Sequence, residues 1–362
     1  MNITEVLVPA QEIAWQPWAV QYFFYIGSSY AATILFFIAL IFKKQTSHAF
    51  RSALVLVMVI GAIVGPLALT GDLHQPGRVG NFYLNLTSWS WMSLGSLFLP
   101  VFSGLTVITS WLYLRDDLAN LKSNSNPVLR RLGWLTLGQW QVSAQWMVFV
   151  SLATLCSGLS VALYTGAEFA VIESRPLWNQ PASPLLWFVT AFLAAIGLTI
   201  LIRALFPSQK HKEFTSFDMK IIQRTGGVSA VLALILLPIW ASNNPTFSLY
   251  ENSSWVINLS TVAISLLASK RFILTLKKAG NPLIIVATLT AAWAVRWVTM
   301  IEVQTIPRFD AGTFPYQMTL DGAGVLAIAG MFGLWIALAL FASELLSSKT
   351  PTYHHSSDSV HS

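Results

Sequence analysis

The sequence has few charged residues and a single cysteine. Only 10% of its 362 residues are charged, while 55% are hydrophobic; an ordinary soluble domain has about 25% charged residues. Most of the chain must therefore avoid water, which predicts an integral membrane protein. The lone Cys156 excludes disulfides within the chain, cysteine-ligated zinc and cysteine-ligated iron–sulfur clusters.

Several functional motifs are also absent. Glu5 and Glu12 precede the first long apolar run, so we expect no cleaved secretory signal. Of six histidines only His74 lies near the outer end of an apolar run, and one histidine cannot supply both axial ligands of a haem. P-loop and dinucleotide fingerprints are missing. The net charge of +6 is scattered between apolar runs, so nucleic-acid binding is not expected.

Apolar runs dominate what remains. A membrane-spanning helix needs about 20 mostly apolar residues, and nine runs approach that length, the seventh being the most polar. They are Ala19 to Phe42, Ala53 to Thr70, Met92 to Leu114, Ala144 to Thr165, Pro184 to Ile202, Gly226 to Ala241, Glu251 to Ser269, Leu283 to Met300 and Ala323 to Leu345. We therefore expect an all-α bundle of nine spanning helices forming one membrane domain over residues 1–346.

The distribution of basic residues predicts the orientation of this bundle. Cytoplasmic loops of membrane proteins collect Lys and Arg. With the N-terminus outside, 17 of the 21 Lys and Arg residues fall on the cytoplasmic side, while Arg78, Arg175 and Arg308 lie outside and Arg296 lies within the eighth run. We expect the N-terminus outside and the C-terminus inside. Residues 347–362 are polar and rich in Ser and His, which predicts a disordered cytoplasmic tail.

Polar residues cluster after the second apolar run. Asp72, His74 and Arg78 follow within seven residues, and ionisable groups at the membrane boundary often serve function. The alternative is an interfacial turn whose charges meet water, since Gly71, Pro76 and Gly77 would also end a helix. We take Asp72 and His74 as candidate catalytic groups.

Two further candidates lie at the end of the fourth run. Tyr164 and Glu168 are four residues apart, so they share one helical face. A phenol and a carboxylate can hydrogen-bond a redox-active hydroxyl and accept its proton. Tyr164 alone could equally belong to the aromatic belt that anchors helices at the lipid headgroups.

Arg296 and Gln21 are polar residues within apolar runs. Arg296 lies about six residues, or roughly 9 Å, below the outer end of its run, where a guanidinium has to be paired or to snorkel. We expect a buried pair with Asp72 or Glu168. Gln21 and its neighbour Tyr22 lie at a similar depth, although Gln21 could instead be a helix-packing amide.

Four segments carry a resemblance to a known family. They are Trp18-Ala19-Val20-Gln21-Tyr22-Phe23-Phe24, Asp72-Leu73-His74-Gln75, Arg175-Pro176-Leu177-Trp178 and Val303-Gln304-Thr305-Ile306-Pro307-Arg308-Phe309. Through them the chain resembles the polysulfide reductase/NrfD family of bacterial inner-membrane subunits. The resemblance runs from the first helix past the eighth. The relatives place Asn and His on the first helix, whereas this chain offers Gln21 and Tyr22.

The resemblance implies the function that we expect. Members of the family carry no cofactor of their own and oxidise menaquinol near the periplasmic surface. The electrons pass to a periplasmic, ferredoxin-like iron–sulfur subunit and then to a molybdopterin catalytic subunit that reduces a sulfur compound. The quinol pocket is then expected to contain Gln21, Tyr22, Tyr164 and Arg296 as binding residues beside Asp72, His74 and Glu168.

Two other functions fit a polytopic membrane protein. A secondary transporter also carries intramembrane charges and broken helices, but its site lies near the midplane. Here the polar candidates gather near one surface, and the cytoplasmic halves of the runs have little polarity. A purely structural anchor would need the basic loops and a docking surface, but would not need Arg296, Asp72 or Glu168.

Overall fold

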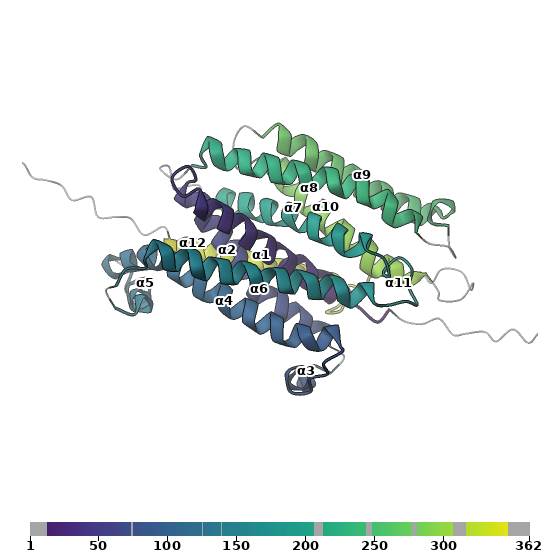
Figure 1. Cartoon of the computed structure of the whole chain (residues 1–362), viewed down its shortest axis with the longest axis horizontal. Helices are drawn as coiled ribbons and strands as arrows, with labels where there is room; N and C mark the ends of the chain where they lie inside the picture. The colour runs from purple at the N-terminus through teal and green to yellow at the C-terminus, as the bar shows by residue number, and fades with distance from the viewer. Residues whose placement is uncertain are drawn as a thin grey trace, which may run out of the picture.

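The protein is a bundle of long helices in a computed structural model (Figure 1). The structure describes residues 13–73, 75–124, 126–138, 140–205, 213–243, 248–276, 281–306 and 316–346. The long helices are α1 (Pro17–Ile41), α2 (His48–Asp72), α4 (Trp91–Asn120), α6 (Ala144–Ala170), α7 (Ala182–Leu205), α8 (Ser216–Ser242), α9 (Ser253–Leu274), α10 (Pro282–Trp297) and α12 (Val325–Leu346). Short helices are α3 (Val79–Leu84), α5 (Pro127–Leu132) and α11 (Val303–Thr305).

The predicted spans are confirmed. Within the described residues, nine helical segments are long and apolar enough to cross a membrane, and one of them corresponds to each predicted run. The seventh run forms α9 despite its Asn, Ser and Thr side chains. The outside location of the N-terminus stays a prediction, because helix length and composition do not distinguish the two membrane faces. The tail from residue 347 lies outside the described residues.

The helix boundaries follow from local chemistry. Ser47, Ser90 and Ser143 cap α2, α4 and α6 by accepting a hydrogen bond from a backbone N–H of the first turn. Thr215 and Asp218 form a reciprocal capping box at the start of α8. Proline stands at the first position of α1 and α10, where its missing N–H costs nothing.

One stretch of the eighth span departs from a regular α-helix. Residues Val298–Glu302 form a π-helical turn between α10 and α11. The three pieces together make one spanning segment, Pro282–Thr305. A single π-turn inside a helix often lies near a functional region, and this one lies at the same end of the bundle as the start of α1.

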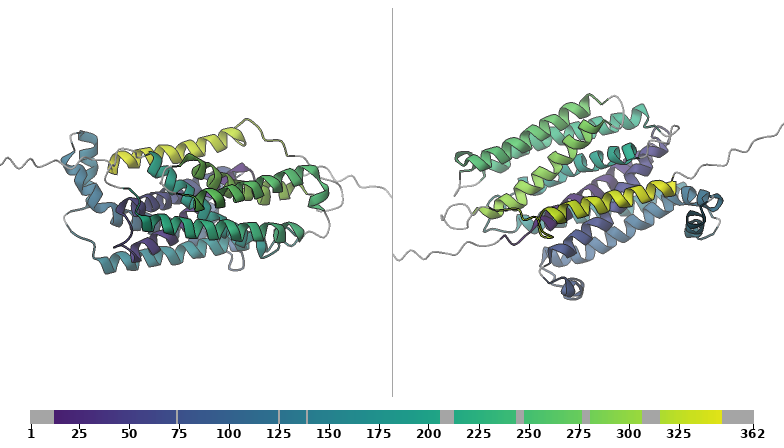
Figure 2. Two further views of the ribbon diagram at one scale, coloured as in Figure 1. Left: turned by 90° about the horizontal axis from the view of Figure 1, so that it is seen from above. Right: turned by 180° about the vertical axis from the view of Figure 1, so that it is seen from behind.

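α1 is the central helix of the bundle. It packs against α2, α6, α7 and α10, and its side chains are almost entirely buried. α4 packs on α6 and α2, while α7, α8, α9 and α10 pack on one another in a second group (Figure 1). α12 packs on α2 and α1, and it lies on the face of the bundle that is turned away from the viewer in Figure 1 (Figure 2).

Glycine allows α1 and α2 to approach closely. A Cβ on Gly61 would stand 2.7 Å from the carbonyl oxygen of Tyr25, and one on Gly65 would stand 3.3 Å from the backbone nitrogen of Ile26. The carbonyl oxygen of Met58 accepts a hydrogen bond of 2.6 Å from the Ser29 hydroxyl across the same contact. Small residues at a helix contact are typical of membrane bundles.

Candidate functional site

The segment before α1 is tied to two other parts of the chain. The backbone nitrogens of Ala14 and Trp15 both donate to Oε1 of Gln304 at 2.9 Å, and Nε2 of Gln304 donates to the Trp15 carbonyl at 3.0 Å. The Gln16 nitrogen donates to Oδ1 of Asp72 at 3.0 Å. These bonds join the start of α1 to the ends of α2 and α11. We call this end of the bundle the pocket end.

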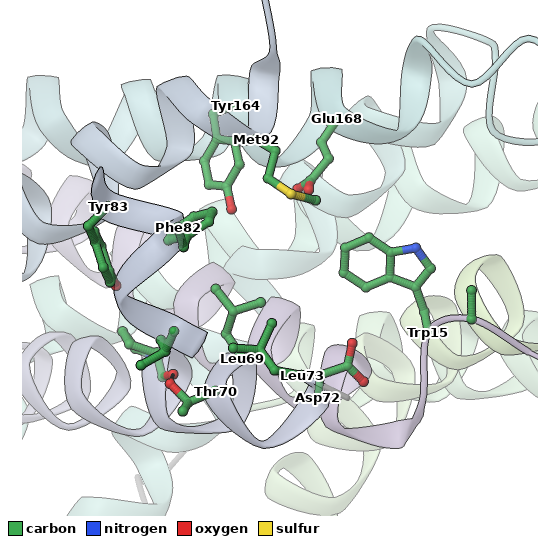
Figure 3. A pocket seen from close by; sticks show the side chains of 13 residues that line it. Trp15, Leu69, Thr70, Asp72, Leu73, Phe82, Tyr83, Met92, Tyr164 and Glu168 are labelled. Carbon is green, nitrogen blue, oxygen red and sulfur yellow. Dashed lines mark hydrogen bonds between the residues drawn. The ribbon is translucent and has the colours of Figure 1, made fainter. Parts of the chain in front are cut away.

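A cavity of about 230 Å³ opens at the pocket end. Its walls come from the segment before α1, the end of α2, α3, the start of α4 and the end of α6 (Figure 3). The lining residues are Ala14, Trp15, Pro66, Leu69, Thr70, Asp72, Leu73, Val79, Phe82, Tyr83, Met92, Tyr164 and Glu168. Most of this lining is apolar, with a few polar groups, as in typical small-molecule pockets.

Glu168 is the most unusual polar group of the cavity. Its side chain is 8% exposed, and its Oε2 atom is buried with no hydrogen-bond partner in the described structure. A buried carboxylate oxygen normally has a donor, because desolvating it without one is costly. The carboxylate points into the cavity from α6 (Figure 3). It is therefore placed to accept a proton or hydrogen bond from a bound molecule.

Tyr164 lies one helical turn before Glu168 and points into the same space. Its hydroxyl is 3.0 Å from the hydroxyl of Tyr22 on α1, and both side chains are buried. The ring of Tyr164 lies against Gly95 of α4, where any Cβ would collide with it. This contact fixes the phenol ring and leaves its hydroxyl at the cavity.

The cavity brings together three of the residues selected from the sequence. Asp72, Tyr164 and Glu168 line it, with Asp72 on the opposite wall from the other two (Figure 3). Tyr22 reaches it only through its contact with Tyr164. His74 lies outside the described residues.

Sequence reasoning missed the contribution of α3. Phe82, Tyr83 and Val79 line the cavity from this helix, which has only six residues and no recognisable apolar period. Partial burial raises the pKa of Tyr83, which keeps its phenol neutral and able to donate a hydrogen bond.

Gln21 does not line the cavity. Its neighbours along the same helical stripe, Trp18 and Tyr25, contact the region of α12: the Trp18 indole donates to the Gly322 carbonyl at 3.0 Å, and the ring of Tyr25 packs on Phe332. Gln21 stands between them on that stripe, fully buried, with both amide atoms unpaired. It therefore lies on the α12 side of α1, away from Tyr22.

The expected pairing of Arg296 with an acid was wrong. Its guanidinium instead donates to the carbonyl oxygens of Phe23 at 2.9 Å, Ala292 at 2.9 Å and Trp187 at 3.3 Å, and to the hydroxyl of Thr190 at 3.3 Å. Gly27 leaves room for this arrangement, because a Cβ there would stand 2.7 Å from Nη2 of the guanidinium. Arg296 joins α1, α7 and α10 and does not line the cavity.

Among the described residues, no group of three His, Cys, Asp or Glu side chains is arranged to hold a metal ion. Nε2 of His48 lies 2.9 Å from Oδ2 of Asp117. This contact lies where α2 begins and α4 ends, at the far end of the bundle from the cavity.

Comparisons with known proteins confirm the resemblance. Residues 5–308 match the family described as polysulphide reductase, NrfD. A tetrathionate reductase subunit of Salmonella typhimurium is 34% identical over 369 residues, covering 98% of each chain. A selenate reductase subunit of Mesobacillus selenatarsenatis is 20% identical over 333 residues, covering 82% of this chain and 75% of the relative. Within the family, the four sequence segments predict a likeness to the membrane subunit of tetrathionate reductase, and the first relative confirms the likeness to a subunit of that enzyme.

Proposed function

The chain belongs to the polysulphide reductase NrfD family, and from this premise we propose that it is the quinol-oxidising membrane subunit of an anaerobic reductase. Its substrate is menaquinol from the lipid phase, and the cavity at the pocket end is the oxidation site. The terminal acceptor of the complex is tetrathionate. The higher identity and coverage of the tetrathionate reductase relative, compared with the selenate reductase relative, support this choice of acceptor.

One observation carries the proposal. A buried carboxylate oxygen of Glu168 without a partner faces a mainly apolar cavity that is also lined by Tyr164 and Asp72. A quinol is an apolar ring with two hydroxyl groups, so it needs apolar walls and a hydrogen-bond partner for each hydroxyl. Tyr164 and Glu168 on α6, with Asp72 across the cavity on α2, supply such partners on two sides.

The reaction releases two protons and two electrons for each quinol. In this proposal Glu168 accepts a proton from one hydroxyl of the quinol, while the phenol of Tyr164 forms a hydrogen bond with the oxygen of that hydroxyl. Asp72 serves as the second proton acceptor. Its Oδ1 already accepts from the Gln16 nitrogen, which fixes the carboxylate at the edge of the cavity. His74 follows two residues later and is proposed from the sequence alone to pass the proton to water.

The electrons leave through a partner chain. Both relatives are named as one subunit of a reductase, which supports an assembly of several different chains. We propose a periplasmic, ferredoxin-like iron–sulfur subunit that docks on the pocket end, and a molybdopterin catalytic subunit reached through it. The membrane subunit is then embedded in the inner membrane with its N-terminus periplasmic.

The decisive experiment measures reduction of the partner's clusters by a menaquinol analogue, in complexes with and without this subunit. We expect reduction only when the subunit is present. Equal reduction without it would leave a structural anchor, and quinol-independent solute uptake into proteoliposomes would identify a transporter. The cavity at one end of the bundle favours quinol oxidation over transport, because transporters bind near the midplane.

A further inference from the structure

The segment between α2 and α4 combines two apolar surfaces. Residues 79–90, which we call the interfacial segment, comprise α3 and the chain up to the cap of α4, and they contain no charged residue. Phe82 and Tyr83 line the cavity on one side. Leu84, Leu86 and Trp89 are 81%, 51% and 86% exposed on the other.

These three large apolar side chains lie outside the spanning helices, so the exposed surface of a span does not account for them. Contiguous exposed apolar residues in a protein mark a binding surface for another protein or for a membrane. Phe82 and Tyr83 line the cavity, whereas Leu84, Leu86 and Trp89 do not, so a binding partner of these three residues would lie outside the cavity. The segment contains Tyr83 and Trp89, and Tyr and Trp are enriched at the level of the lipid headgroups in membrane proteins.

The position of the segment selects the lipid surface over a protein partner. α3 lies beside the bundle, displaced sideways from the first turns of α4 and not over the helix ends (Figure 1). Leu97 and Val101 of α4 are 48% and 55% exposed on a segment that is long and apolar enough to span a membrane, so we assign them to an apolar belt that faces lipid. The apolar surface of the segment therefore continues that belt at its edge.

We propose that residues 79–90 form an interfacial anchor that lies in the headgroup layer of the leaflet at the pocket end, with Leu84, Leu86 and Trp89 inserted into it. The anchor holds Phe82 and Tyr83 over the cavity, and the apolar tail of the substrate leaves the cavity beneath α3 into lipid. The path of the substrate tail rests on the proposed function, whereas the interfacial anchor does not. Phe82 and Tyr83 are then positioning residues at the lateral opening of the cavity.

Spin labels test the anchor directly. In a Cys156→Ser background, single cysteines replace Leu84, Leu86 or Trp89, and the labelled full complex is reconstituted into phosphatidylglycerol–phosphatidylethanolamine vesicles. Control labels replace Val101, in the apolar belt, and Ser174, which is exposed in the loop after α6. We expect all three test labels to show oxygen accessibility above that of Ser174 and nickel-chelate accessibility above that of Val101, as a headgroup-depth position requires.

Two results would overturn the anchor. Nickel accessibility equal to that at Ser174 would put the segment in water. Protection from both reagents that appears only when the outer subunits are bound would assign the surface to a protein partner. These depth measurements do not require turnover, so a failure of quinol oxidation leaves them valid.

Kinetics test the opening beneath α3. The triple variant Leu84→Ser, Leu86→Ser, Trp89→Ser should raise the KM for a long-tailed menaquinol about 10-fold or more, while the KM for a tail-less naphthoquinol changes less than 2-fold. Equal changes for both substrates would refute the lateral path. An absence of oxidation of either quinol by the unaltered complex would instead refute the proposed function.

Discussion

Among single residues, Glu168 has a buried carboxylate oxygen without a hydrogen-bond partner in the described structure. Burying a carboxylate without a donor destabilises the folded protein, so replacing it by a neutral amide should not harm folding. Gln keeps the shape of the side chain but cannot accept a proton. The unpaired carboxylate oxygen is thus a cost to folding that the proposed chemistry uses.

We predict that Glu168→Gln slows quinol oxidation by about 10² to 10⁴-fold, because general-base catalysis typically contributes that factor. Asp72→Asn should also slow it, and its remaining Oδ1 can still accept from the Gln16 nitrogen. Both variants should assemble with the outer subunits. The measurement is the rate of cluster reduction by a menaquinol analogue in purified complexes.

Glu302→Gln provides the matched control for these variants. Glu302 is a half-buried carboxylate at the same end of the bundle, it accepts a hydrogen bond from the Trp297 indole at 3.1 Å, and it does not line the cavity. Its rate should stay close to that of the unaltered protein. Full turnover in both Glu168→Gln and Asp72→Asn would reduce the cavity to a structural feature.

The hydrogen-bond partners of Arg296 could not be predicted from the sequence. Its burial and need for partners followed from its depth in an apolar run, but its partners are mostly backbone carbonyls, which leave no pattern in the side chains. Tyr164 and Glu168 could be paired from helical spacing alone. That they and Asp72 share one cavity required knowing how α2 and α6 are arranged.

At the scale of elements, hydrophobicity predicted the long helices but not their irregularities. The nine spans of the described residues were predictable because a helix that crosses the hydrocarbon core needs about 20 mostly apolar residues, which form a long run in the sequence. The π-helical turn at Val298–Glu302 and the six-residue α3 leave no recognisable pattern of apolar residues in the sequence, so hydrophobicity alone does not reveal them. α5 was missed too, although Asn126 and Pro127 provide a cap and a first-position proline.

The close contact between α1 and α2 predicts that replacing a glycine there by alanine lowers the stability of the protein. A glycine within a helix normally costs about 1 kcal/mol relative to alanine. Gly61→Ala should nevertheless lower the thermal stability of the detergent-solubilised protein, because its Cβ would lie 2.7 Å from the Tyr25 carbonyl oxygen. Overpacking of this kind typically costs about 1–3 kcal/mol.

Gly104→Ala is the control for this prediction. Gly104 is also inside a helix, α4, but no atom lies within 4 Å of the position that its Cβ would take. This substitution should leave the melting temperature unchanged or raise it. If Gly61→Ala proved as stable as Gly104→Ala, the close approach of α1 and α2 would be incorrect.

For the whole molecule, the first prediction concerns orientation. The bias of 17 of the 21 basic residues toward one side predicts that cysteines placed near Glu5 and Asp310 react with an impermeant reagent in intact cells. A cysteine near Lys210 should react only after the membrane is permeabilised. The native Cys156 is replaced by Ser in all variants. Labelling near Lys210 in intact cells would invert the topology and move the cavity to the cytoplasmic side.

The second whole-molecule prediction concerns energy conservation. The cavity, its proton acceptors and the proposed exit for electrons all lie at the pocket end of the bundle. In the described residues, carboxylates and histidines occur at the two ends of the spans, with Asp72, Glu168 and Glu302 at the pocket end and His48, Asp117 and Asp218 at the other. Within the spans, Arg296 lies in the half nearer the pocket end, and its guanidinium donates to carbonyls and a hydroxyl. A row of carboxylates that could carry protons across is therefore not found in that part of the chain.

Quinol oxidation should for this reason be electroneutral. Moving one elementary charge across 100 mV is worth roughly 2.3 kcal/mol, so a transmembrane proton path would couple turnover measurably to the membrane potential. In proteoliposomes that contain the complete complex, menaquinol-driven reduction of tetrathionate should generate no voltage-dye signal, and dissipating an imposed potential with valinomycin and K⁺ should leave its rate unchanged. A co-reconstituted proton pump verifies that the vesicles are sealed. A potential that develops without that pump would mean that protons or electrons cross the bilayer through this subunit, and Thr106, whose buried hydroxyl on α4 has no partner, would then be the first residue to replace.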